Sequence, residues 1–467
     1  MTVTESMIEV QRSKVFGTQP KVDLVSPCRI GYGILRLSEE EQNALLKRFH
    51  HANLTPHFFI PASGSGSRMF QFLFDFLEKP SEDNQSQVER FLNHLEDFAF
   101  FRKIHADIKQ QLNDNKIDLA QFVRYVVGKE GLELGDLPKG LVPFHNYGYF
   151  ILNPFQEQVL QAAKMGGGKA KLHFTINLKF EGKIKETIEQ VCAISGYQIE
   201  ATFSTQNEDT DSIAFALDGT IFELSPGKPL TRPSGHGALL ENLNEVASEM
   251  VFIKNIDNVQ HESHAHISIR ENQKIGGLLL KLKEDLAEIV KDGVVNRALF
   301  FDVVRYYQLE ATDLEEMTDM DIKAYINRPR RVCGMVRNEG QPGGGPFWVK
   351  STNGKISKQI VEKAQIASSG DQFNVMVKSS HFNPVLMACD RYDLEGNLLD
   401  LNRFKDDEMY FVVKRNYKGH DILFAEQPGL WNGGMADWLT VFVETDSNAF
   451  TPVKTVLDLL ESAHQSS

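Results

Sequence analysis

Apolar and polar residues alternate along the first half of the chain with two periods, one helical and one extended. Residues 38–52 carry apolar side chains at helical spacing, with acidic residues early and basic residues late, which predicts a helix. The apolar run that starts at His57 (HFFIPA) predicts a buried strand. Helices and strands are then expected in turn at 154–164, 171–178, 183–194 and 197–205. This alternation indicates an α/β layered fold with parallel strands.

The remaining pattern divides the chain into three parts. Residues 1–55 form an expected N-terminal helical and β extension, 56–330 a core, and 331–467 a mostly strand-like part that completes the core. A polar, amphipathic stretch predicts a helical insertion in the core at about 76–135. After the first half of the chain we expect a hairpin at 213–224, a helix that opens at Gly235 and a strand at 250–257. Further helices are expected at 273–326, a linker at 341–346 and a final helix at 452–462.

Composition narrows the class of protein. The 467 residues exceed the size at which a single core usually stops growing. With 42% hydrophobic and 24% charged residues, no apolar run of membrane-spanning length and no export signal, we expect a cytoplasmic protein. The net charge of −13 argues against sequence-independent binding of nucleic acid. The four scattered cysteines predict reduced thiols rather than a disulfide framework or a zinc knuckle.

A turn of small residues follows the first predicted strand and leads through Arg68 and Met69 into an apolar stretch. It consists of Ser63, Gly64, Ser65, Gly66 and Ser67. Glycines let backbone N–H groups approach a phosphate, and a helix N-terminus adds partial positive charge. The turn fits neither the dinucleotide fingerprint, which needs a third glycine at Met69, nor the P-loop, which needs a Lys-Ser/Thr pair. An ordinary tight turn explains it equally well.

Three charged residues stand where a phosphate site would use them. Lys139 lies in a constrained loop between Pro138 and Pro143. Asp257 ends a predicted buried strand, where open α/β sheets bind their ligands. Lys454 is expected in the first turn of the final helix. Each also has a structural explanation, namely a lysine with a buried stem, a helix-capping aspartate and a surface lysine.

In this order the motifs resemble those of the nucleotide-sugar pyrophosphorylases, the nucleotidyltransferases that make NDP-sugars. Their G-x-G-x-R-M loop is similar to residues 64–69, and their P-K-x-L-x-P segment is similar to residues 138–143. Within that family, the chain resembles the UDP-sugar pyrophosphorylases in particular. Their D-N, F-x-P-V-K-T-x-x-D-L-L and P-x-G-x-G motifs resemble residues 257–258, 450–460 and 233–237. The chain also resembles a bacterial family of unknown function.

The resemblance implies a three-layer nucleotide-diphospho-sugar transferase fold, Rossmann-like, with a mixed sheet. It also implies that the protein joins an NTP, with UTP the first choice, to a sugar 1-phosphate or similar phosphate, giving an NDP-sugar and pyrophosphate. The attacking phosphate is already ionised near pH 7, so the chemistry needs cations and backbone donors rather than a catalytic triad. Arg68, Lys139 and Lys454 are the expected catalytic cations, and Asp257 is the expected ligand of Mg²⁺.

Base and sugar recognition are expected from further polar residues. The nucleotide is assigned to the turn at 63–67 together with Gln206, Pro233, Gly235, His236 and Gly237. The sugar is assigned to Asn258, His381, Asn383 and Asn432. A plain strand end explains Gln206 equally well, loop capping explains the segment around His381 slightly better, and buried structural tryptophans explain residues 429–438 equally well.

Two other functions stay open. An NDP-sugar glycosyltransferase would use a D-x-D metal signature, which 209–211 and 319–321 satisfy, although chance matches are expected among 63 acidic residues. A non-catalytic nucleotide-sugar sensor would keep the pocket without turnover. The run 261–266 looks metal-like, yet H-E-x-x-H would need a histidine at position 265. We expect small-molecule substrates and no nucleic acid, membrane or obligate protein partner.

Overall fold

The computed structural model describes residues 4–114, 116–309, 314–340, 344–351, 354–367 and 369–466. The chain divides into two compact units, and each is built from separate stretches of sequence. Unit 1 holds Met1–Asn53, Gln206–Ile253 and Asn272–Thr445. Unit 2 holds Leu54–Thr205, Lys254–Glu271 and Asp446–Ser467.

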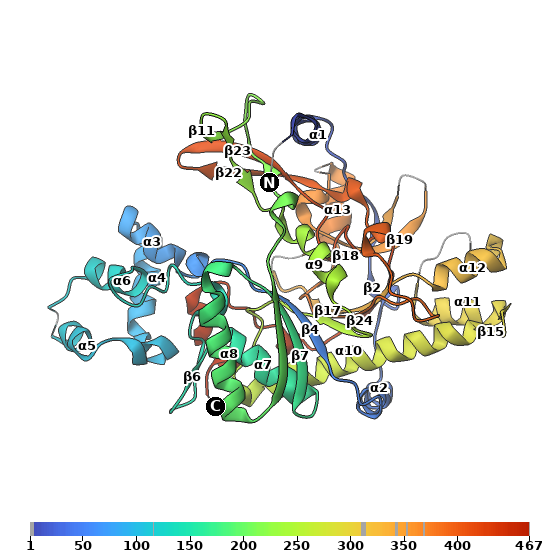
Figure 1. Ribbon diagram of the computed structural model, residues 1–467, viewed down its shortest axis with the longest axis horizontal. Coiled ribbons are helices and arrows are strands. Elements are labelled where there is room, and N and C mark those ends of the chain that lie inside the picture. Colours follow the sequence, from blue (N-terminus) through green and yellow to red (C-terminus); the bar gives the residue numbers. More distant parts are fainter. Residues whose placement is uncertain are drawn as a thin grey trace. The chain divides into compact units, whose positions relative to one another are not determined.

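Three parallel strands form the sheet of unit 2 in the order β4-β7-β8 (Figure 1). They are β4 (His57–Pro61), β7 (Lys169–Thr175) and β8 (Gln198–Ser204). Parallel neighbours need a crossover connection, and α8 (Glu181–Ser195) supplies it between β7 and β8. This helix ends at Gly196, whose φ of 70° is left-handed and therefore suits glycine.

A second helix of unit 2, α7 (Pro154–Met165), packs against β7 and α8 and is buried along most of its length. Proline at its first position and a reciprocal capping box between Asn153 and Gln156 fix where the helix begins. Three further polar residues on α7 are also buried, namely Glu157, Gln158 and Gln161. Buried polar groups require hydrogen-bond partners. Gln158 and Gln161 find them in the loop that carries Asp257, and Glu157 finds them in His145 and Tyr147.

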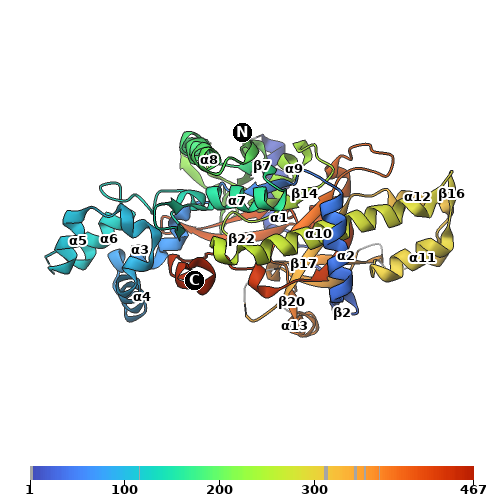
Figure 2. The same ribbon diagram turned by 90° about the horizontal axis from the view of Figure 1, so that it is seen from below.

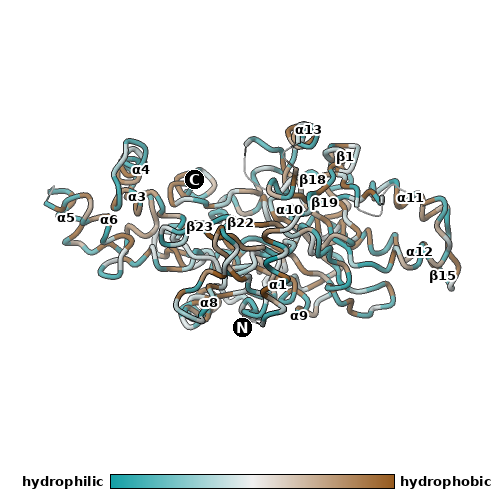
Figure 3. Tube along the Cα trace, turned by 90° about the horizontal axis from the view of Figure 1, so that it is seen from above, coloured by the Kyte–Doolittle hydropathy of each residue, from teal (hydrophilic) through white to brown (hydrophobic). Residues whose placement is uncertain are grey.

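Four helices follow the glycine turn and confirm the predicted helical insertion. They are α3 (Gln71–Glu78), α4 (Glu82–Asn93), α5 (Ala106–Asn113) and α6 (Leu119–Val127). They lie beside the strands of unit 2 rather than over them (Figure 1 and Figure 2). Most of α4 is hydrophilic (Figure 3), and its apolar residues Val88 and Phe91 are buried.

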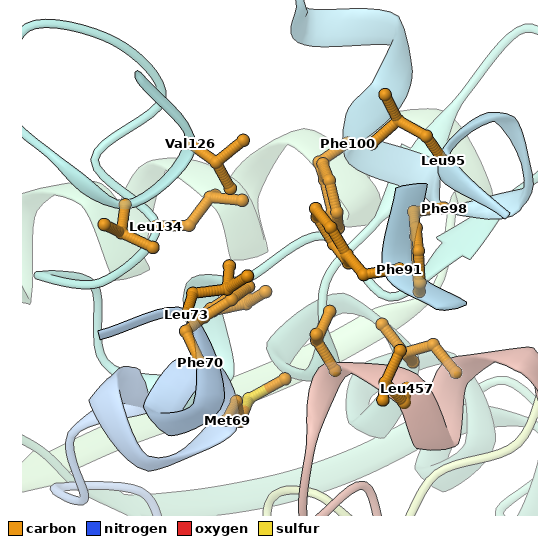
Figure 4. Packing of buried hydrophobic residues seen from close by; sticks show 14 of the residues in the cluster. Met69, Phe70, Leu73, Phe91, Leu95, Phe98, Phe100, Val126, Leu134 and Leu457 are labelled. Carbon is orange, nitrogen blue, oxygen red and sulfur yellow. The ribbon is translucent and has the colours of Figure 1, made fainter. Parts of the chain in front are cut away.

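Stacked phenylalanines dominate the core that these helices share with the rest of unit 2. The ring centroids of Phe91 and Phe98 are 5.1 Å apart, and those of Phe98 and Phe100 are 5.2 Å apart. Met69 and Leu457, which are distant in sequence, pack into the same cluster (Figure 4). The cluster also contains Val142, Val259 and Val453. Because these apolar residues neighbour the predicted site residues in sequence, hydrophobic packing brings the motifs together.

The sheet of unit 1 is mixed, with its strands in the order β2-β3-β24-β17-β21-β14. The pairs β2/β3, β3/β24 and β24/β17 are parallel, whereas β21 is antiparallel to both β17 and β14. The strands are β2 (Arg29–Ile30), β3 (Gly33–Leu35), β24 (Leu439–Glu444), β17 (Arg330–Arg337), β21 (Met387–Asp390) and β14 (Val251–Ile253). The mixed α/β class predicted from the sequence is confirmed.

The other strands form small antiparallel groups. In unit 1 these are β1 (Asp23–Pro27) with β18 (Gly345–Lys350) and β19 (Ile356–Val361), and β10 (Phe215–Ala216) with β23 (His420–Glu426) and β22 (Phe411–Tyr417). Shorter pairs are β9 (Ser212–Ile213) with β13 (Thr231–Arg232), β11 (Glu223–Ser225) with β12 (Lys228–Pro229), and β15 (Val290–Lys291) with β16 (Val294–Val295). In unit 1 β20 (His381–Phe382) pairs with β17, and in unit 2 β5 (His145–Asn146) pairs with β6 (Ile151–Leu152).

The remaining α-helices are α1 (Glu5–Phe16), α2 (Glu39–His51), α9 (Leu239–Glu245), α10 (Glu262–Ile289), α11 (Arg297–Tyr306), α12 (Asp319–Ile326) and α13 (Gly370–Val377). The longest is α10, with 28 residues (Figure 2). No helix among the described residues is both long enough and apolar enough to cross a membrane.

Three predicted elements differ from the structure. The final helix is wrong: residues 456–460 and 462–464 form two short 3-10 helices, and Lys454 precedes both. The predicted helical stretch at 273–326 is interrupted by the β15–β16 hairpin. Part of the expected linker, residues 341–343, lies outside the described residues, and Gly345 and Pro346 belong to strand β18.

Candidate active site

The glycine turn of unit 2 is joined to the Lys139 loop through the backbone. Gly66 N donates to Leu137 O at 2.9 Å, and Lys139 N donates to Gly64 O at 3.2 Å. The long insertion therefore leaves the two motifs side by side, as in an antiparallel bridge between Ser65 and Pro138. The glycine turn and the Lys139 loop are therefore neighbours in unit 2.

Glycine is required where these loops approach each other. A Cβ added at Gly66 would lie 2.8 Å from Leu137 O, closer than real side chains approach a backbone oxygen. A Cβ added at Gly140 would collide with the ring of Phe155 in α7. A larger residue at either position would push the Lys139 loop away from its neighbours.

Two lysines from distant motifs converge on the carboxylate of Asp257. Lys139 Nζ donates to Asp257 Oδ2 at 2.6 Å, and Lys454 Nζ lies 3.9 Å from the same oxygen. The side chain of Asp257 is 7% exposed, that of Lys139 is 17% exposed and that of Lys454 is 55% exposed. These three side chains comprise two cations and one anion, and Asp458 adds a second carboxylate near Lys139. The cluster therefore offers two ammonium groups to an anionic ligand without an excess of positive charge.

Backbone pairing with the strand end places Lys454 there. Val453 N donates to Asp257 O at 3.3 Å, and Asn258 forms an isolated bridge with Pro452. The side chain of Asn258 accepts from Thr451 N at 3.0 Å. Asn258, predicted to bind sugar, thus also holds the backbone next to the site.

Asp458 holds the backbone around Lys454 from the other side. Its carboxylate accepts from Lys454 N at 2.6 Å and from Thr455 N at 2.7 Å, and Thr455 and Asp458 form a capping box. This box replaces the predicted helix start, because it closes a 3-10 turn rather than an α-helix.

Burial and Asp257 act on Lys139 in opposite directions. Burial lowers the pKa of Lys139, since desolvation disfavours the ammonium, whereas the carboxylate of Asp257 raises it. Lys454 lowers the pKa of Lys139 slightly further, as expected of a neighbouring cation. An incoming anion would stabilise the charged ammonium of Lys139 in the same way as Asp257 does.

Arg68 stands at the exposed end of the glycine turn. Its side chain is exposed and makes no hydrogen bond or ion pair with any residue that the structure describes. Its neighbour Met69 shares the core cluster with Val453, which precedes Lys454. The structure therefore anchors the Arg68 backbone in the same cluster as the Lys454 backbone, and leaves the guanidinium available to a ligand.

The amides of the turn are divided between internal bonds and open donors. Gly66 N is bonded to Leu137, and Ser67 N donates to Ser65 Oγ at 3.2 Å. Within the described residues, the amides of Ser63, Gly64 and Ser65 make no such bond. The backbone donors left for a phosphate are thus those at the start of the turn.

A magnesium ion would find one carboxylate at this place. No group of three or more His, Cys, Asp or Glu side chains suited to a metal occurs in the described part of the chain. Mg²⁺ commonly uses one or two carboxylates and completes its shell with substrate phosphates and water. Asp257 fits that pattern, with Lys139 on one of its two oxygens.

The predicted base-binding residues lie in unit 1, in two loops that pack on each other. His236 stacks on Trp431 with ring centroids 4.1 Å apart, and its Nδ1 accepts from Leu430 N at 2.9 Å. Burial lowers the pKa of His236 to about 4, so the ring is neutral. Gly235 has a left-handed φ of 69°, and a Cβ there would collide with the Glu426 carboxylate.

The other predicted residues of unit 1 occupy separate surroundings. Asn432 is 0% exposed, and its Nδ2 donates to Gln365 at 3.0 Å. His381 lines a cavity of about 410 Å³, and its Nε2 lies 3.7 Å from Glu444. The side chain of Asn383 accepts a hydrogen bond from Val385 N. Gly237 and Pro233 belong to the loop of His236. Gln206 is the first residue after the Leu54–Thr205 stretch of unit 2. Their assignment to nucleotide or sugar stays a prediction.

Comparison with known proteins identifies the family. The chain matches the family model described as "Domain of unknown function (DUF4301)" over residues 1–465. The chain belongs to the DUF4301 family. This agrees with the expected membership of a family of unknown function. A comparison with curated proteins gives no match to this DUF4301 chain.

Several solved structures are similar to the DUF4301 chain at low identity. A mutant of UDP-glucose pyrophosphorylase from Leishmania major in complex with UDP-Glc is 13% identical, with a TM-score of 0.46, over 100% of this chain and 76% of that chain. UDP-glucose phosphorylase from Trypanosoma brucei is 13% identical, with a TM-score of 0.44, over 96% and 74%. The inositol-1-phosphate CTP transferase from T. maritima is 8% identical, with a TM-score of 0.32, over 84% and 85%. All three scores lie below one half, and the proposal below therefore rests on the geometry of the side chains.

Sequence reasoning missed the residues that hold the Asp257 loop. Gln158 Nε2 donates to Asn255 O at 3.0 Å, and Gln161 Nε2 donates to Gln260 O at 3.1 Å. The pattern in the sequence was polar residues beside apolar ones along α7. The same pattern is typical of a helix whose polar side faces solvent, so it did not indicate buried hydrogen bonds. Asp458 was detectable, because Thr455-x-x-Asp458 has the spacing of a capping box.

Proposed function

We propose that the protein is a nucleotidyltransferase that joins an NTP, with UTP the first choice, to a sugar 1-phosphate. The observation that carries the proposal is the convergence of Lys139 and Lys454 on Asp257, beside a glycine turn that keeps backbone donors open. The motif array that resembles the nucleotide-sugar pyrophosphorylases adds independent support. Without that array, the same cluster would indicate only an anion site.

The reaction requires neutralisation of charge more than acid or base catalysis. An ionised phosphate oxygen of the sugar 1-phosphate forms a bond to the α-phosphorus of the NTP. The bond from that phosphorus to the bridging oxygen breaks, and pyrophosphate leaves with the electron pair. Charge spreads over the phosphoryl oxygens in the transition state, so fixed cations lower the barrier.

The side chains divide this work in the proposal. Lys139 and Lys454 bind phosphate oxygens, and Asp257 holds Lys139 in place while leaving an oxygen for a cation. Arg68, being exposed at the end of the turn, binds the β- and γ-phosphates together with the amides of Ser63 to Ser65. Bound Mg²⁺ would supply further neutralisation of the phosphates.

The test is direct. Purified protein is incubated with each of the four NTPs, Mg²⁺ and a panel of sugar 1-phosphates, and pyrophosphate release is measured. We expect release with at least one pair and the highest rate with UTP. Nucleotide binding without release with any pair would contradict the proposal and favour a nucleotide-sugar sensor.

The glycosyltransferase alternative is separated by a single substitution. Burial raises the pKa of Asp211, the second acid of the D-x-D at 209–211, and no metal group surrounds it among the described residues. Under the present proposal Asp211→Asn leaves pyrophosphate release unchanged. Loss of turnover in this variant, with Lys454→Ala unaffected, would favour glycosyl transfer.

A further inference from the structure

A buried network of ionisable side chains lies in unit 2 outside the proposed chemistry. His145, at 0% exposure, places Nδ1 2.7 Å from Glu157 Oε1 and Nε2 3.0 Å from His464 Nδ1. Tyr147 donates to the same Glu157 oxygen at 2.9 Å and stacks on His261 with ring centroids 4.4 Å apart. The network thus joins the β5–β6 hairpin, α7, the start of α10 and the C-terminal residues.

The protonation pattern suits hydrogen bonding rather than metal binding. The carboxylate of Glu157 can only accept, so His145 donates to it through Nδ1. Burial is the main cause that lowers the pKa of His464 to about 3, and the neighbouring His145 lowers it further. The His464 ring is therefore neutral at pH 7. Burial also lowers the pKa of His261. In the described residues no metal-binding group is formed here.

His464 connects this network to the site through the backbone of Thr451. That backbone hydrogen-bonds the His464 ring and opposes the effect of burial on its pKa. Thr451 N donates to Asn258, and Thr451 Oγ1 accepts from Gln260 at 2.7 Å. Hydrogen bonds therefore lead from Asn258 to Thr451, and from Thr451 to His464. His464 in turn contacts His145, which the buried carboxylate of Glu157 holds.

The C-terminal segment, residues 446–466, is held on both sides of Lys454. Thr451 is the attachment before Lys454, and Ala463 O, which accepts from His261 N at 2.9 Å, is the attachment after it. Between them the segment contains only short 3-10 helices, whose weak internal bonds make it dependent on tertiary contacts. Val453 and Leu457 supply the apolar contacts.

Lys454 itself has little packing to fix its position. Its side chain is 55% exposed, and its ammonium lies 3.9 Å from Asp257, beyond hydrogen-bond distance. The course of the backbone therefore decides where this cation stands. A displacement of about 1 Å is enough to weaken catalysis strongly when a group must meet a transferring phosphate.

We propose that His464, held by His145 and Glu157, is a positioning residue that keeps the C-terminal segment in place and so sets Lys454 beside Asp257. The inference rests on the proposed function of Lys454. It adds a second set of residues, remote from the phosphates, on which nucleotide affinity and turnover depend.

The first experiment measures UTP affinity by calorimetry and turnover by pyrophosphate release. We expect His464→Ala to lower UTP affinity or kcat/KM about tenfold, within the range of coupling energies for networked residues. His464→Asn, whose amide can still hydrogen-bond to His145 Nε2, recovers most of the loss. His94→Ala is the control, because His94 is a half-exposed histidine of the same unit paired with Asp97.

A double-mutant cycle with Lys454→Ala separates positioning from general stability. If His464 acts through Lys454, adding His464→Ala to Lys454→Ala changes UTP affinity and turnover by less than about twofold. A persisting tenfold loss would overturn the inference. Should Lys454→Ala alone change neither quantity, the proposed function fails, and that result is distinct from failure of the positioning role.

Hydrogen exchange provides a readout that needs no turnover. His464→Ala is expected to speed exchange of the amides of Thr451 and Val453, which bond to Asn258 and Asp257. Unchanged exchange at both amides would overturn the inference. If His464→Ala does not fold, Tyr147→Phe removes one donor to Glu157 and should give the same changes at about threefold.

Discussion

The proposed phosphate-binding cluster of unit 2 and the paired loops of unit 1 were predicted from equally short motifs, yet they use their polar groups differently. In unit 2, Lys454 and Arg68 keep exposed charged ends, and Lys139 is turned toward one carboxylate. In unit 1, His236 accepts from Leu430 and stacks on Trp431, and Asn432 is buried.

The difference teaches that a glycine motif alone does not distinguish a ligand site from a packed loop. Gly66 lets two backbones pair and leaves donors open before it, whereas Gly235 lets a backbone pass the Glu426 carboxylate. A site is indicated when charges from distant segments meet and keep bonding capacity. The following substitutions test whether this distinction holds.

The largest effect is expected from Lys454→Ala. Because Lys454 is more than half exposed, its loss removes a phosphate-neutralising charge with little cost to folding, and turnover should fall at least about a hundredfold. Pyrophosphate release measures it. Lys171→Ala is the control, since Lys171 is a partly exposed lysine of unit 2 paired with Glu200. Near-normal turnover would remove Lys454 from the mechanism.

Asp257→Asn should raise the Mg²⁺ concentration that gives the half-maximal rate about tenfold. Loss of a residue that orients a bound metal typically lowers metal affinity by at least this factor. Asp257 also raises the pKa of Lys139 against the effect of burial. Removing its charge lowers that pKa further, so the alkaline limb of the pH–rate profile should move to lower pH. An unchanged metal response and an unchanged limb would show that Asp257 serves neither purpose.

Gly66→Ala should lower the free energy of unfolding by about 1–3 kcal/mol and weaken UTP binding, because its Cβ would press on Leu137 O. Urea unfolding and calorimetry measure the two effects. Gly182→Ala in α8 is the matched control, since a Cβ there meets nothing within 4 Å. Equal behaviour of the two variants would mean that the close approach of the loops is unimportant.

The smallest effect on turnover is expected from His236→Gln, which should instead change how the free energy of unfolding depends on pH. Burial lowers the pKa of His236 to about 4, so the unfolded chain binds this proton more readily than the folded chain. The contribution of the neutral ring is complete above the unfolded pKa of about 6.5 and is lost as pH falls toward 4. Between these values the variant should lose about 2–3 kcal/mol less stability than the unchanged protein. If the free energy of unfolding changed with pH equally in the variant and in the unchanged protein, the burial of the His236 ring would be contradicted.

Much of the fold could be predicted because its elements follow local patterns. The α2 helix carries its capping box in Ser38-x-x-Glu41, and the β4 strand is a single apolar run. The final helix could not be predicted correctly. The segment from Val456 to Leu460 has helical spacing, but its contacts with the phenylalanine cluster and the capping box of Thr455 and Asp458 favour a 3-10 turn.

The same contrast applies to the candidate site. Lys139, Asp257 and Lys454 were found because motif order survives insertions, and the structure brings these three together. The buried network around Glu157 was not found, since its members are spread from His145 to His464 and form no pattern in sequence. Long-range hydrogen bonds of this kind depend on the tertiary fold.

The Lys139–Asp257 ion pair spans 118 positions of the sequence. Contacts of such separation carry a high loop-closure cost, so they are expected to form after the local helices α3 to α6 during folding. Under the proposed function, a triphosphate binds residues that meet only in the folded molecule. It should therefore slow unfolding far more than it hastens refolding, and cells rich in nucleotide would keep the protein folded longer than dilute buffer does.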